Sequence, residues 1–280
     1  MGLSVIVVSY ESHPVLEECL AALVGRPGID EVIVADCSLE NPARDLGMEY
    51  PAVEFIHFDQ ARMIPELRWA GLRSARGEFV AWLEAWMVPA EDWSQQFLTG
   101  FRLHPQAVMI GGAVSYPSSP RPIWQWAYYF CEYSSTIDDS SETRSPSGAN
   151  VCFRRDALEQ LAGPAWENEI EQAFRAAGAE VLGCGAAAEF RPEFSLSRAS
   201  RQRLHYGRDY AAARFSGPRR WLHALLPAVL FARLAARAFR CAAILRFVAA
   251  APWIVWFVVV WSLGEAGGYV FGASSWRRIY

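Results

Sequence analysis

Strand-like and helix-like segments alternate along the first third of the chain, and this alternation constrains the fold more than any other feature. Residues 3–8 form a continuous aliphatic run, as in strands that are covered on both faces. Residues 14–23 then repeat apolar side chains at a helical spacing. Strands that alternate with helices over short connections predict an α/β fold, with a doubly wound, mostly parallel sheet and helices on both faces. Further strands are predicted at 31–35, 53–58, 79–83 and 107–115, and further helices at 64–75 and 167–177.

Polar residues follow three of these predicted strands at the point where each strand ends. Ser9 and Tyr10 follow the first strand, Asp36 and Ser38 follow the second, and Glu84 ends the strand at 79–83. Ligands of open α/β sheets bind at the carboxyl ends of the strands. There a carboxylate can accept hydrogen bonds from a base or ribose, and a tyrosine can stack on a base. The alternative is that these residues only form turns or cap helices.

The order of the motifs resembles that of a family 2 glycosyltransferase with a GT-A fold, over residues 3–214. The end of the chain resembles that of a membrane-associated bacterial branch of the family. The resemblance implies a nucleotide-sugar donor, with Tyr10 beside the base, Asp36 on uracil or ribose, and Ser9 and Ser38 in the same binding site. The motifs that carry the resemblance are Arg76-Gly77-Glu78, Glu84-Ala85-Trp86, Ser147-Gly148-Ala149-Asn150, Trp166-Glu167-Asn168-Glu169, the segment 202–208 and the segment 263–269.

The acidic motif that ends the strand at 79–83 has one carboxylate where the family usually has two. The family's Asp-x-Asp cluster holds a divalent metal and the sugar diphosphate, whereas this chain has Glu84 followed by Ala85 and Trp86. Mg²⁺ is often held by one or two carboxylates together with substrate phosphates and water. The resemblance therefore implies Mg²⁺ or Mn²⁺ at Glu84. The alternative is an exposed acid that opens a loop.

Two glutamates match the acidic motif that supplies the family's catalytic base. The resemblance implies that Glu167 is the general base, which takes a proton from the acceptor hydroxyl, and that Glu169 binds substrate. For either residue the alternative is a favourable interaction with the helix dipole. Arg208 would balance the charge of the departing diphosphate, and Arg68 and Arg203 would bind substrate. The alternatives are a solvated helix arginine for Arg68 and a patch for anionic lipid headgroups around Arg203 and Arg208.

The last quarter of the chain predicts contact with a membrane. Residues 247–264 are 18 residues without a charge, near the lower limit of about 17–25 residues for a span. Residues 221–239 have an amphipathic pattern, which is typical of helices in a membrane interface. Arginines before the apolar run outnumber those after it, which predicts a catalytic domain on the cytosolic side of the cell inner membrane. The alternative is a buried helix of a soluble domain.

We therefore expect a GT-A domain at residues 1–215 and membrane-associating helices at 216–280. The expected function is inverting transfer of a sugar from a nucleotide diphosphate to a lipid-linked or surface-polysaccharide acceptor at the cytosolic membrane face. The alternative is a catalytically impaired relative that acts as a membrane-anchored binding or scaffolding subunit. The net charge of −4 argues against nucleic acid as a partner. The aromatic run at 123–133 would form either an acceptor platform or a packed helix.

Overall fold

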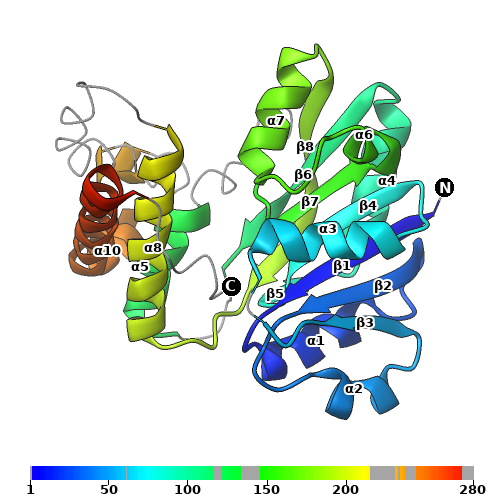
Figure 1. Ribbon diagram of the computed structural model, residues 1–280, viewed down its shortest axis with the longest axis horizontal. Helices are drawn as coiled ribbons and strands as arrows, with labels where there is room; N and C mark the ends of the chain where they lie inside the picture. The colour runs from blue at the N-terminus through cyan, green and yellow to red at the C-terminus, as the bar shows by residue number, and fades with distance from the viewer. Residues whose placement is uncertain are drawn as a thin grey trace. The chain divides into compact units, whose positions relative to one another are not determined.

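The computed structural model describes residues 2–60, 62–116, 121–133, 146–214, 231–232, 234–236 and 244–272. These residues form two compact units. The sheet unit contains all the described strands with helices α1 to α4, α6 and α7, and the helical unit contains α5, α8 and α10 (Figure 1). The expected boundary at residue 215, between a GT-A domain and membrane-associating helices, stays a prediction. The amphipathic pattern at 221–239 lies mostly outside the described residues.

Four parallel strands form the first half of the sheet. They are β1 (Leu3–Ser9), β2 (Ile29–Asp36), β3 (Val53–His57) and β4 (Phe79–Glu84), in the spatial order β3-β2-β1-β4. Every residue of β1 is buried, which explains its unbroken apolar run. The register places Asp36 beside both Ser9 and His57, and Glu84 beside Val8. The carboxyl ends of all four strands therefore meet at one edge of the sheet.

The second half makes the sheet mixed, although most strand pairs are parallel. β7 lies antiparallel between β4 and β6, β6 pairs parallel with β8, and β8 pairs antiparallel with β5. The fold class is confirmed, but β5, β7 and β8 were not predicted. The sequence of β8 is rich in glycine and alanine, so its pairing partners rather than its composition make it a strand. The bounds are β5 (Met87–Pro89), β6 (Ala107–Ser115), β7 (Asn150–Arg154) and β8 (Glu180–Phe190).

Helix α3 (Ile64–Ser74) lies directly against β1. A Cβ at Gly71 would be 2.5 Å from Cγ2 of Ile6, so the absence of a side chain permits this close approach. Arg68, one turn before Gly71, is thereby held near the end of β4. The other helices of the sheet unit are α1 (His13–Leu23), α2 (Ala43–Glu49), α4 (Trp93–Leu103), α6 (Arg155–Glu159) and α7 (Glu167–Ala176).

The helical unit is built around α10 (Ile244–Phe271), which packs against α8 (Leu196–Arg214) and α5 (Ile123–Tyr133). A Cβ at Gly264 would be 2.0 Å from the carbonyl oxygen of Leu204, so glycine allows the backbones of α8 and α10 to touch. The aromatic run at 123–133 forms α5, and its side chains at 128, 129, 130 and 133 are buried. At these four positions the aromatic side chains therefore belong to a packed helix.

The face of α10 that does not pack on its neighbours is apolar and exposed. Val248, Val255, Val259 and Leu263 recur along it at spacings of seven, four and four residues, which is one stripe of a helix. Within the described residues, α10 is the helix that is long and apolar enough to cross a membrane. One side of α10 is therefore buried against α8 and α5, and the other side is exposed.

Candidate active site

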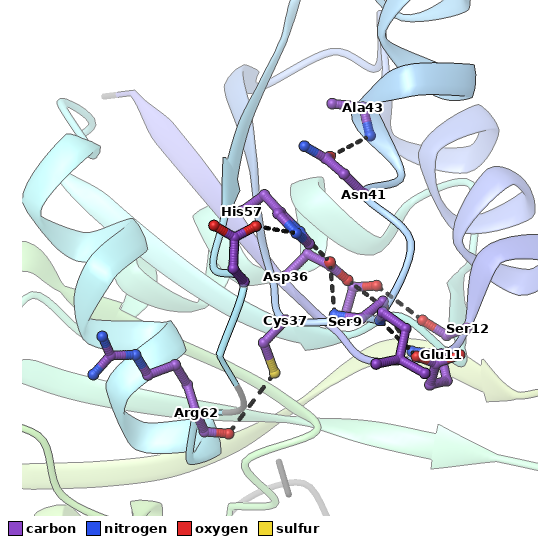
Figure 2. Close-up of polar contacts among 12 residues, drawn as sticks. Ser9, Glu11, Ser12, Asp36, Cys37, Asn41, Ala43, His57 and Arg62 are labelled. Carbon is purple, nitrogen blue, oxygen red and sulfur yellow. Dashed lines mark hydrogen bonds and ion pairs between the residues drawn. The ribbon is translucent and has the colours of Figure 1, made fainter. Parts of the chain in front are cut away.

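Asp36 is the centre of a hydrogen-bond network at the ends of β2 and β3. Its carboxylate is buried and accepts hydrogen bonds from the backbone N–H of Ser38 at 2.9 Å and from the Ser38 hydroxyl at 2.7 Å. Nδ1 of His57 lies 2.9 Å from Oδ2 of this carboxylate, the same oxygen that accepts from the Ser38 N–H. Figure 2 shows Asp36 between His57 and the loop that carries Ser9 and Glu11. This arrangement fixes the carboxylate at the edge where the sequence predicts the nucleotide.

The loops that follow β1 and β2 are tied together beside Asp36. The backbone N–H of Glu11 donates to the Ser38 hydroxyl at 2.7 Å, and the backbone N–H of Leu39 donates to Oε1 of Glu11 at 2.7 Å. Glu11 has a φ of 47°, the left-handed conformation that non-glycine residues adopt rarely. The two hydrogen bonds hold this conformation in place. Ser9 is buried and its hydroxyl lies 3.0 Å from that of Ser12.

Tyr10 lies with two other aromatic side chains beside the same edge. Tyr10, Phe58 and Trp166 pack together against a buried apolar cluster formed by Val8, Ala35, Cys37, Ile64 and Leu67. Trp166 immediately precedes Glu167, so this cluster also places the start of α7 near the ends of β1 and β2. Aromatic side chains at this position fit the predicted stacking on a base.

Arg68 joins the two predicted acidic positions, Glu84 and Glu167. Its guanidinium is 2% exposed; Nη1 lies 3.0 Å from Oε2 of Glu167, and Nη2 lies 3.8 Å from Oε1 of Glu84. Nη2 also donates to the carbonyl oxygen of Gly148 at 2.7 Å, and the guanidinium stands 5.0 Å from the ring centroid of Trp82. A charge so deeply buried needs partners, and here the partners come from three separate segments: β4, the loop at Gly148 and the start of α7. The alternative of a solvated Arg68 is wrong.

Gly148 makes this convergence possible. A Cβ at Gly148 would be 2.5 Å from Oε2 of Glu167 and 2.7 Å from Nη2 of Arg68. Any side chain at this position would displace one of the two charged groups. The next residues of the same motif serve the fold: Asn150 is fully buried, donates to the carbonyl oxygens of Ala113 and Ala186, and accepts from Trp93.

Three other predicted site residues have structural partners. Oε2 of Glu169 accepts from the backbone N–H of Trp166 at 2.9 Å, which caps α7. Arg203 and Arg208 belong to α8 in the helical unit, where Arg203 pairs with Glu132 and Nε of Arg208 donates to the carbonyl oxygen of Gly272. The substrate roles of these residues stay predictions.

The sequence interpretation missed His57, Trp82 and the carbonyl group of Gly148. His57 ends β3 beside Asp36, so the rule that directed attention to Ser9, Asp36 and Glu84 applied to it as well. Trp82 reads in the sequence as one more apolar residue of a buried strand. No pattern in the sequence shows that it lies under a guanidinium.

The residues around Glu84 do not fit a divalent cation held by the protein. Ala85 and Trp86 offer no side-chain oxygen, and the Oε1 atom of Glu84 already faces Arg68. Within the part of the chain that the structure describes, no group of three or more His, Cys, Asp or Glu side chains is placed to hold a metal. Mg²⁺ can be held by a single carboxylate together with substrate phosphates and water, but here that carboxylate is shared with a buried guanidinium, which makes it a poor site for a cation.

Comparison with solved structures shows the fold. The mannosyltransferase PcManGT from Pyrobaculum calidifontis, solved with GDP-Man and Mn²⁺, is 18% identical with a TM-score of 0.59, covering 94% of this chain and 86% of that one. Glucosyl-3-phosphoglycerate synthase from Mycobacterium tuberculosis, solved with Mn²⁺, UDP and phosphoglyceric acid, is 14% identical with a TM-score of 0.51, covering 74% and 76%. TarS from S. aureus is 14% identical with a TM-score of 0.51, covering 96% and 91%.

The family is shown by the sequence itself. No curated protein sequence matches the chain. The sequence model of glycosyl transferase family 2 matches residues 4–162, a region that includes Asp36, Arg68, Glu84 and Gly148. This match extends over more than half of the chain, and the similar structures share its mixed, mostly parallel sheet. The chain therefore belongs to glycosyl transferase family 2 and has a GT-A-like fold.

Proposed function

We propose that the protein transfers a sugar with inversion from a nucleoside diphosphate donor to a lipid-linked or surface-polysaccharide acceptor. The observation that carries the proposal is the convergence of Glu84, Arg68 and Glu167 at the sheet edge that also holds Asp36. One edge then has a buried acceptor network for the nucleoside, a cation for phosphate, and a carboxylate for the acceptor hydroxyl.

Glu167 is the proposed general base. Its carboxylate takes the proton of the acceptor hydroxyl as that oxygen bonds to the anomeric carbon from the face opposite the diphosphate. The bond between the anomeric carbon and the diphosphate oxygen breaks, and its electron pair leaves with the nucleoside diphosphate. Arg68 orients Glu167 through the contact at 3.0 Å and contributes positive charge near the leaving group.

A pair of conservative substitutions tests this role. Glu167→Gln keeps an oxygen that can accept from Arg68 but cannot take a proton, so transfer should fall about 10²–10⁴-fold. Glu169→Gln should reduce transfer less than Glu167→Gln does, because the Glu169 carboxylate accepts from the backbone N–H of Trp166 and caps α7. Transfer is followed as release of nucleoside diphosphate from UDP- and GDP-sugars, and donor affinity is measured by calorimetry. Equal losses in both variants would show that Glu167 is not the base.

The second candidate function is binding without transfer. It is favoured by Ala85 and Trp86, which follow Glu84 where the family's motif has its second acidic residue. This function predicts that nucleotides bind while no donor yields product with any acceptor, including membrane lipid extracts. Slow but Glu167-dependent transfer with any donor would exclude it.

We further propose that the protein acts at the cytosolic face of the cell inner membrane and that the exposed stripe of α10 contacts lipid. The stripe is apolar along its length, and Arg246 near the start of the helix lies on the other side, where its guanidinium stands 4.5 Å from the ring centroid of Trp126 in α5. Because the opposite side of α10 packs on α8 and α5, this pattern favours a helix that lies along the surface with one face in lipid.

Matched triple variants test the lipid contact. Val255, Val259 and Leu263 changed together to Gln should move the protein from floating liposomes to the soluble fraction. The control changes Leu39, Met48 and Leu103, which are 92%, 86% and 70% exposed in the sheet unit, to Gln. The control protein should float like the wild type. If the α10 variant also floats unchanged, this stripe is not the lipid contact.

A further inference from the structure

The guanidinium of Arg68 is a buried charge in the sheet unit, and one of its N–H groups has no acceptor within the part of the chain that the structure describes. It is 2% exposed, and it is held by Glu167, Glu84, the carbonyl oxygen of Gly148 and the ring of Trp82. Its Nε is buried and has no hydrogen-bond acceptor among the described residues. A buried donor without an acceptor costs free energy, so the position is suited to an acceptor supplied by a ligand.

A divalent cation and this guanidinium compete for the same oxygen. Mg²⁺ lies about 2.0–2.1 Å from its oxygen ligands, and Oε1 of Glu84 already lies 3.8 Å from Nη2 of Arg68. A metal on Glu84 would place two positive charges on one carboxylate oxygen. The neighbouring residues give no relief, since Ala85 is fully buried and neither Ala85 nor Trp86 carries an oxygen ligand.

Arg68 cannot easily move away to admit a metal. Its hydrogen bonds reach Glu167 and Gly148, which lie 99 and 80 residues after it in the sequence. The centroid of the Trp82 ring lies 5.0 Å from the guanidinium carbon. Moving it would leave Glu167 without its buried partner. The cation at this end of β4 is therefore built into the fold.

We propose that Arg68 takes the place of a divalent metal and that this protein binds the diphosphate of its donor without one. The inference builds on the proposed function, because it assigns the cation that meets the donor's diphosphate. A guanidinium presents several N–H donors in a plane and forms bidentate contacts with phosphate oxygens. Glu84 then acts as a positioning residue for Arg68.

The first experiment needs no variant. The full-length protein, freed of metal, is titrated with UDP, GDP and their sugar conjugates in EDTA and, separately, in excess Mn²⁺. The expected result is donor affinity that agrees within about threefold between the two conditions, less than the tenfold that equals about 1.4 kcal/mol. Electron paramagnetic resonance of Mn²⁺ should show no bound signal in the presence of the nucleotide beyond that of nucleotide alone.

Two variants examine the cause. Trp86→Asp adds a carboxylate two residues after Glu84 and should create donor binding that Mn²⁺ strengthens by at least about tenfold. Arg68→Met should weaken donor binding in EDTA by at least about tenfold, as expected when a charged hydrogen bond is lost. Arg68→Lys keeps the charge and guards against a folding failure of the methionine variant, and it should retain metal-free binding. Arg73→Gln removes an exposed arginine from the same helix and is the control.

The outcomes separate this inference from the proposed function. Donor binding by the wild type that requires Mn²⁺ would overturn the inference and leave the transferase proposal standing. Binding of no nucleotide in either condition would overturn both. Metal-free binding that Arg68→Met leaves unchanged would show that another group receives the diphosphate, and that would also overturn the inference.

Discussion

Replacing Asp36 tests the network at the ends of β2 and β3. Asp36→Ala removes the acceptor of the Ser38 N–H, the Ser38 hydroxyl and His57, which lie 2.9, 2.7 and 2.9 Å away. A hydrogen bond to a charged group contributes about 1.5–3 kcal/mol. Ser38 is only partly buried and regains some water, so we expect a loss of about 3–4 kcal/mol in the free energy of unfolding.

Asp36→Asn should cost much less. The amide keeps one oxygen, which can accept from the Ser38 N–H and from His57, and its NH₂ group can donate to the Ser38 hydroxyl. We expect a loss of about 1 kcal/mol, the difference between charged and neutral hydrogen bonds. As a control, Asp45→Ala removes the same charge from an exposed position, and should change stability by less than about 1 kcal/mol.

Urea unfolding followed by circular dichroism measures these losses as shifts of the midpoint at constant m. Nucleotide titration of each folded variant gives the second readout. If Asp36 also meets the ligand, Asp36→Asn should weaken nucleotide binding by about tenfold while it preserves most of the stability. Equal and small stability losses for Ala and Asn would refute the network argument, and unchanged nucleotide affinity in both would restrict Asp36 to a structural role.

Two further predictions concern packing and thiol chemistry. A Cβ at Gly77 would lie 2.7 Å from the backbone nitrogen of Ser4, so Gly77→Ala should destabilise the protein by about 1–3 kcal/mol. A Cβ at Gly163 would meet nothing within 4 Å, so Gly163→Ala is the control and should be nearly neutral. Equal urea midpoints for the two variants would contradict this reasoning. Burial raises the pKa of the Cys37 thiol to about 11, so its alkylation should be slow at pH 8 and accelerate about tenfold for each pH unit up to pH 10, as read by peptide mass spectrometry. A rate that levels off below pH 9 would contradict the assigned burial.

The candidate site could be predicted from the sequence only where local pattern and strand order are sufficient. Local sequence patterns are sufficient for the aliphatic runs of β1 and β4 and for the helical spacing of α3. Parallel strands of one sheet bring their carboxyl ends to the same edge, independently of the rest of the chain. The grouping of Ser9, Asp36 and Glu84 follows from that rule, and the register confirms it. The family resemblance added the expectation for Glu167.

Only the tertiary structure decided the second half of the sheet and the partners of the charged groups. The β7 strand reads as the approach to a helix, yet it becomes a strand because β4 and β6 offer unpaired backbone groups on both sides. Arg68 reads as a surface residue of a helix, and its burial depends on Glu167, which lies 99 residues away along the chain. The sequence by itself determined the strands β1 to β4 and the polar residues that follow β1, β2 and β4. The contacts that bury Arg68 between Glu84 and Glu167 join segments that are distant in the sequence, so they form only once the sheet and its helices have assembled.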